Sequence, residues 1–174
     1  GSSQNPMFYR PFREWELPEP GKRDVKSLLM KAVGAKNPQG LQEILDSADN
    51  IAFGHFKPHI GAKEFLNLSY MQALKAAAEN FDGHFAFGVF FNKKMEAQIT
   101  RLAVEQGYTI YRTNGEVVKG NSSKPALIFL GPQRQIMTSS LFTSATMPNI
   151  VTGDLSLSDA VYALIAMGGQ GFFY

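Results

Sequence analysis

Apolar residues recur every three or four positions in several stretches, a spacing typical of amphipathic helices. The first such stretch has Asp24 as its expected N-cap and Gly34 just beyond its end, and a later one has Asn92 and Gly107 in the same roles. A stretch near the C-terminus is apolar on almost all sides, which predicts a deeply buried helix capped by Ser156 or Ser158. The helices are predicted over 24–33, 40–48, 62–81, 92–106 and 159–167.

Other stretches are apolar without a helical period, which is typical of strands. The two strongest are HFAFGVFF at 84–91 and ALIFL at 126–130. Shorter strands are predicted at 51–53, 108–112, 116–119, 135–138 and 172–174, the segment 135–138 as the partner of 126–130.

The order of these elements defines the fold class. Residues 84–112 form a strand–helix–strand unit of the length expected for a parallel βαβ crossover. Asn114-Gly115 then predicts a tight hairpin, which adds an antiparallel strand. We therefore predict one three-layer α/β domain with a mixed sheet. Its expected core is Phe85, Phe87, Val89, Ile99, Leu102, Ile110, Leu127, Phe129, Val161, Leu164 and Ile165.

The segment before the first helix has a different composition. Residues 1–3, Gly-Ser-Ser, are typical of an expression-tag remnant. Four prolines within residues 4–21 predict an extended arm, followed by a single domain over 22–174. The arm carries Phe8, Tyr9, Arg10, Phe12, Arg13 and Trp15. Aromatic and arginine side chains are typical of protein-binding hot spots and also suit stacking on nucleic-acid bases, or the arm packs on its own domain.

Composition narrows the class of protein. A chain of 174 residues that is 44% apolar has the size of one globular domain. It has no cysteine and only three histidines, so we expect no disulfide, metal centre or cofactor. Its net charge is only +2, and residues 135–174 contain no lysine or arginine. This charge-poor C-terminal region is predicted to be core, an interface, or both.

Candidate chemistry is sparse. Arg134 precedes a hydroxyl-rich stretch at 138–146, and Arg134, Ser139 and Ser140 are candidates for an anion-binding site. His55 and His59 flank Pro58, which argues against a shared helix face and predicts a loop with exposed histidines. No nucleotide P-loop, nucleophile elbow or zinc-protease motif occurs.

These observations favour a non-catalytic interaction or assembly subunit, which docks through the arm and the charge-poor C-terminal region. The expected partner is another protein or a second copy of this chain. One alternative is a small hydrolase or transferase acting near Arg134 and the hydroxyl cluster, with His55 or His59. The other is a nucleic-acid-binding domain that uses the arm with Lys22, Arg23 and Lys26. No apolar run is long enough to span a bilayer, and a soluble protein of the cytoplasm is expected.

Overall fold

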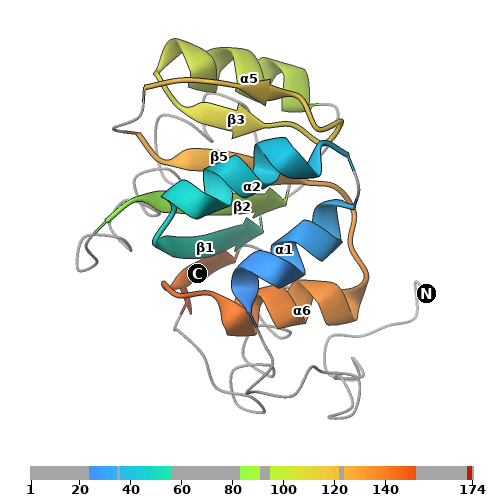
Figure 1. Cartoon of the computed structure of the whole chain (residues 1–174). Helices are drawn as coiled ribbons and strands as arrows, with labels where there is room; N and C mark the ends of the chain where they lie inside the picture. The colour runs from blue at the N-terminus through green and yellow to red at the C-terminus, as the bar shows by residue number, and fades with distance from the viewer. Residues whose placement is uncertain are drawn as a thin grey trace.

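A computed structural model describes residues 24–34, 36–55, 83–90, 95–121, 124–151 and 172–173 of the chain (Figure 1). Seven strands in this part form a single sheet with the order β4-β3-β5-β2-β1-β6-β7. Every pairing is parallel except that of β3 with β4. The strands are β1 (Asn50–His55), β2 (Phe85–Phe90), β3 (Thr109–Tyr111), β4 (Val117–Val118), β5 (Ala126–Leu130), β6 (Asn149–Val151) and β7 (Phe172–Phe173).

Helices lie on both faces of the sheet, and the alternation of side chains along the strands supplies a core to each. α1 (Val25–Val33), α2 (Pro38–Ser47) and α6 (Gln135–Ser144) share one face, which is turned toward the viewer in Figure 1. α5 (Glu96–Glu105) packs on the other face. In β5, Leu127 and Phe129 point toward α5, whereas Ile128 and Leu130 point toward the three-helix face. The α/β class, the mixed sheet and the three layers are therefore confirmed.

Local sequence signals account for the helix ends. The Asp24 carboxylate accepts hydrogen bonds from the Lys26 N–H at 3.2 Å and the Ser27 hydroxyl at 2.7 Å. The serine hydrogen bond is the main reason why the pKa of Asp24 lies below its usual value. At the other ends, Gly34 and Gly107 adopt positive φ angles just past α1 and α5, as expected for residues that terminate helices.

The central elements agree with the sequence prediction. The strand β5 has the predicted bounds, and β1 extends from Asn50 to His55 around the predicted 51–53. The Asn114-Gly115 turn pairs Ile110 with Val118 and Tyr111 with Val117 in antiparallel register. However, β2 and β3 are not neighbours, because β5 lies between them. All the predicted core residues that the structure describes are buried, apart from Phe85 and Leu102, which are half-buried against the α5-side core.

Two predictions about the helices need correction. Residues 135–138 are not a strand; they open α6, whose Leu141 and Phe142 are buried on the three-helix face. The helix α5 begins at Glu96, and its N-cap position is Met95, three residues after the predicted cap Asn92. The proposed cap Asn92, the helices at 62–81 and 159–167 and the core residues Val161, Leu164 and Ile165 lie outside the described residues.

Candidate functional site

A cleft of about 650 Å³ lies beyond the carboxyl ends of β3 and β5. The residues that follow these two strands form part of its lining, together with the end of α1 and the first turn of α5. Its lining is half apolar and half polar. The apolar part includes Ala32, Val33, Phe129 and Leu130, and the polar part includes Lys36, Glu96, Arg112, Thr113, Asn114 and Gln133.

The topology of the sheet explains why a cleft forms at this point. After β3 the chain turns outward to the edge strand β4, whereas after β5 it crosses to α6 and then to β6 on the opposite side of β1. The two connections therefore leave neighbouring parallel strands in opposite directions. In open α/β sheets, ligands bind in the crevices that such diverging connections leave at the carboxyl ends of strands.

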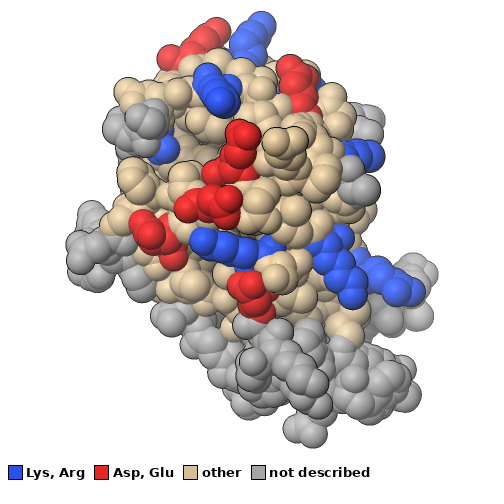
Figure 2. All heavy atoms as spheres, viewed as in Figure 1, with Lys and Arg blue, Asp and Glu red and all other residues tan. Residues whose placement is uncertain are grey.

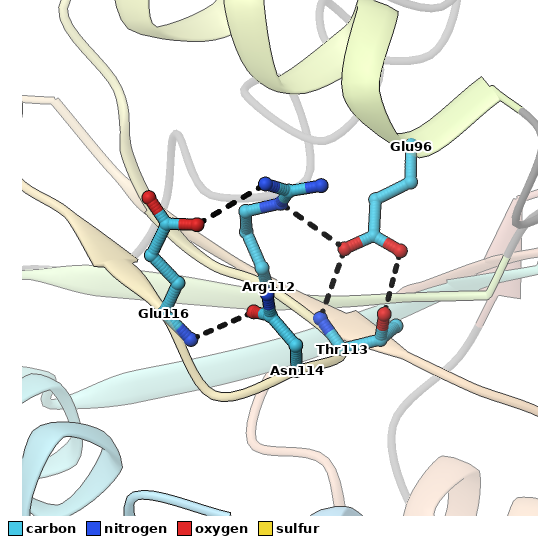
Figure 3. Close-up of polar contacts among 5 residues, drawn as sticks. All are labelled: Glu96, Arg112, Thr113, Asn114 and Glu116. Carbon is cyan, nitrogen blue, oxygen red and sulfur yellow. Dashed lines mark hydrogen bonds and ion pairs between the residues drawn. The ribbon is translucent and has the colours of Figure 1, made fainter.

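Glu96 is the central charged group of the cleft, although only 4% of its surface is exposed (Figure 3). It lies in the first turn of α5, and its oxygens accept hydrogen bonds from the Thr113 N–H at 3.0 Å and the Thr113 hydroxyl at 2.6 Å. The Arg112 Nε also faces Glu96 Oε1, at 3.4 Å. These donors compensate the cost of removing the carboxylate from water. They also tie α5 to the end of β3.

Arg112 is held from two sides. Besides the contact with Glu96, its Nη1 lies 3.1 Å from Glu116 Oε2, on the other arm of the hairpin (Figure 3). The Arg112 side chain retains 27% exposure, whereas that of Glu116 is 53% exposed. The partly buried Glu96 contact therefore fixes the guanidinium more firmly than the exposed Glu116 contact does.

The opposite wall of the cleft is fastened to the same hairpin. The Tyr111 hydroxyl donates a hydrogen bond to the Lys36 carbonyl, and the Asn37 amide donates to the Gly115 carbonyl at 2.7 Å. Burial raises the pKa of Tyr111, which further favours the protonated hydroxyl that donates this hydrogen bond. Because both walls are attached to one turn, the cleft is preformed without a ligand.

A second pocket of about 470 Å³ lies at the other ends of the strands, where β2, β3 and β5 begin. Its lining includes His84, Lys119, Lys124 and Glu43. The Lys124 ammonium lies 5.7 Å from the centre of the Tyr108 ring. This pocket opens at the amino ends of the parallel strands, which is not where ligands of open α/β sheets bind. The first cleft is therefore the stronger candidate.

The sequence-predicted site residues lie elsewhere. Arg134 is exposed at the N-cap position of α6, whereas Ser139 and Ser140 are buried within that helix. The Ser140 hydroxyl donates to the Ile136 carbonyl at 2.7 Å. The anion site at these three residues stays a prediction. The arm residues Phe8, Tyr9, Arg10, Phe12, Arg13 and Trp15 lie outside the described part of the chain, as does His59.

The position of His55 in the structure differs from the one predicted from the sequence. It is the last residue of β1 rather than part of a loop, and it is half-buried, with its ring centre 5.8 Å from that of Phe90. Burial lowers the pKa of His55, which favours the neutral imidazole. No group of three or more histidine, aspartate or glutamate side chains within the described ranges is placed to hold a metal ion.

Sequence reasoning did not single out Glu96 or Arg112. They are separated by 16 positions and meet only because α5 runs back along the sheet to β3. A signal was nevertheless present, since Glu96 falls three and four positions before Ile99 and Thr100, on the buried face of α5. A carboxylate on an apolar helix face needs partners, and that requirement points to a polar network.

Comparison of the chain with protein-family models, with curated proteins and with solved structures finds no match. Among the helices that the structure describes, none is long and apolar enough to cross a membrane. The class that fold and site define is thus an open α/β domain with a preformed cleft at the carboxyl edge of its sheet.

Proposed function

We propose that this chain is a binding domain for a small organic molecule, which occupies the cleft beyond β3 and β5. The observation that carries the proposal is the position of the cleft, where the connections after two neighbouring parallel strands diverge. Its volume of about 650 Å³ falls within the range of small-molecule sites, roughly 300–1,000 Å³. Its mixture of an apolar wall with a few fixed polar groups is also typical of such sites.

The polar groups of the cleft are suited to binding rather than to acid–base chemistry. Both oxygens of Glu96 already accept hydrogen bonds from Thr113, and Oε1 also faces Arg112. A carboxylate occupied in this way orients its neighbours and is poorly placed to take a proton from a substrate. A ligand would meet the remaining donors of Arg112 and Lys36. The Asn114 amide nitrogen and the Gln133 amide oxygen also line the cleft, whereas the Asn114 oxygen already accepts from the Glu116 N–H and the Gln133 nitrogen donates to the Ala32 carbonyl.

Filling the cleft tests the proposal. Gly131 lines it, and a Cβ added there would meet no atom within 4 Å, so Gly131→Trp introduces bulk without disturbing the core. We expect millimolar benzamide to shift the backbone amide signals of residues 111–114 and of Leu130, Gly131 and Gln133 in heteronuclear NMR spectra. Gly131→Trp should abolish these shifts. Gln39→Trp, at an exposed position of α2 outside the lining, should retain them.

Two results would contradict the proposal. Benzamide could shift signals only outside the cleft, or it could bind Gly131→Trp as well as the unmodified chain. Far-ultraviolet circular dichroism of both variants establishes that the fold is intact before binding is compared.

Association through the N-terminal arm is a second candidate function, favoured by its six closely spaced aromatic and arginine residues. The charge-poor region contributes less to this candidate than its composition predicts. Within residues 135–151 of this region, the side chains of Leu141, Phe142, Met147 and Asn149 are buried inside the domain. On the face shown in Figure 2, acidic and basic side chains of the described residues are interspersed, which gives no support to a phosphate-binding surface there.

A further inference from the structure

We infer that the ligand of the cleft carries a single carboxylate on an apolar body. This inference rests on the proposed function and adds the chemical class of the ligand. Three charged side chains line the cleft, namely Lys36, Arg112 and Glu96. Arg112 is paired with Glu96 and with Glu116 just outside the lining, so Lys36 is the one charged group of the lining without an acidic partner among the described residues, and one monovalent anion neutralises it.

Lys36 provides the uncompensated charge. It is exposed on the turn between α1 and α2, and its ammonium forms no hydrogen bond or ion pair with any residue that the structure describes. The backbone of the same residue is fixed, because its carbonyl accepts the hydrogen bond from the Tyr111 hydroxyl. The base of this cation is therefore attached to the cleft wall while its charged end remains available to a ligand.

Arg112 provides the directional contact. Its Nε and Nη1 face Glu96 and Glu116, which leaves Nη2 without a partner among the described residues. An arginine whose plane is already fixed loses less conformational freedom when it binds a carboxylate. Glu96, and to a smaller degree the exposed Glu116, act here as positioning residues for the guanidinium.

The same two glutamates disfavour ligands of higher charge. A second anionic group in the cleft would have no further cation to meet and would lie near the buried Glu96 carboxylate. In addition, no glycine-rich phosphate loop follows β5. The apolar wall of Ala32, Val33 and Leu130 favours a hydrocarbon or aromatic body next to the carboxylate.

Three probes built on the same benzene ring distinguish these requirements: benzoate, its neutral analogue benzamide and the dianion isophthalate. At low salt we expect benzoate to bind at least roughly tenfold more tightly than benzamide, because a hydrogen bond to a charged group adds about that much affinity over a neutral one. Isophthalate should bind more weakly than benzoate. The benzoate preference should decrease between about 20 and 300 mM sodium chloride, because the Lys36 ammonium is exposed.

Variants identify the residues responsible. Arg112→Gln should bring the benzoate and benzamide affinities to near equality. Lys36→Gln, at an exposed position where misfolding is not expected, should reduce the preference several-fold. Lys31→Gln removes an exposed lysine of α1 outside the lining and should leave the preference unchanged.

The outcomes separate this inference from the proposed function. If benzamide binds in the cleft as tightly as benzoate, the small-molecule site stands and the carboxylate inference is overturned. Tighter binding of isophthalate than of benzoate also overturns it. If no probe binds in the cleft, both proposals fail. An equal loss of preference in Lys31→Gln and Lys36→Gln would show that general surface charge, not the cleft, attracts the anion.

Discussion

Gly88, in the middle of β2, marks a point where the sheet and the helices leave no room for a side chain. A Cβ at Gly88 would overlap the ring of Phe53, which is fully buried in β1. That ring is itself confined, since its centre lies 6.4 Å from those of both Phe90 and Phe142. The glycine is therefore required by the packing of three aromatic rings rather than by its backbone conformation.

We expect Gly88→Ala to lower the free energy of unfolding by about 1–3 kcal/mol, the usual cost of overpacking a rigid core. Urea denaturation measures the change. Gly131→Ala is the matched control, because an added Cβ there meets no atom within 4 Å. Phe53→Leu should relieve the overlap. The double variant Gly88→Ala/Phe53→Leu should therefore lose less unfolding free energy than the sum of the losses in the two single variants. Strict additivity would contradict the account.

At the scale of elements, Asn37 joins the start of α2 to the turn between β3 and β4. Its side-chain oxygen accepts from the Gly40 N–H at 3.1 Å and caps α2, while its amide donates to the Gly115 carbonyl at 2.7 Å. Its φ angle of 50° lies in the left-handed region, which asparagine tolerates better than most residues. One residue thus provides a helix cap, a turn conformation and a contact between the two walls of the cleft.

Asn37→Ala should destabilise the protein by about 1–2 kcal/mol, because the substitution removes the helix cap and because alanine adopts the left-handed conformation poorly. Asn37→Gly should cost less, because glycine adopts that conformation freely. Thermal and urea unfolding compare the two variants. If Gly were as harmful as Ala, the left-handed backbone would not contribute, and the loss would come from the side-chain hydrogen bonds alone.

The elements themselves were largely predictable from sequence, and the exception has a physical cause. The buried run at Ala126–Leu130 and the Asn114-Gly115 turn are local signals, and both are confirmed. The start of α6 was predicted as a strand that returns to pair with 126–130, and the hydroxyl-rich stretch at 138–146 is typical of turns and caps rather than of a helix interior. In the structure two of these hydroxyls donate to carbonyls one turn earlier in the helix, Ser140 to Ile136 at 2.7 Å and Thr143 to Ser139 at 2.9 Å.

At the scale of the whole molecule, the sheet order and the cleft depend on contacts that no local pattern encodes. The insertion of β5 between β2 and β3 places residues 131–133 beside residues 112–114. A strand–helix–strand pattern fixes the direction of β3 but not its neighbour. For that reason the strands that support the cleft can be predicted from local patterns, whereas the charged pair within it, Glu96 and Arg112, cannot.

The arm and the cleft provide two functions that can be separated experimentally. The described residues that line the cleft lie between Ala32 and Gln133, whereas the aromatic and arginine residues of the arm lie within 4–21. If the arm mediates self-association, light scattering during size exclusion should give a multiple of 19.2 kDa for the full chain and the mass of a single shortened chain after deletion of residues 4–21. Phe12→Ala/Trp15→Ala should act like the deletion, because aromatic anchors dominate such contacts.

The benzoate affinity of the cleft should be unchanged in both arm variants, which makes it the internal control for folding. A full chain that elutes as a single copy would contradict self-association. Excess absorbance at 260 nm that disappears at high salt would instead support nucleic acid as the partner of the arm, because binding through phosphate contacts weakens steeply as the salt concentration rises. Loss of benzoate binding together with the arm would contradict the separation itself, and would mean that the arm contributes to the cleft.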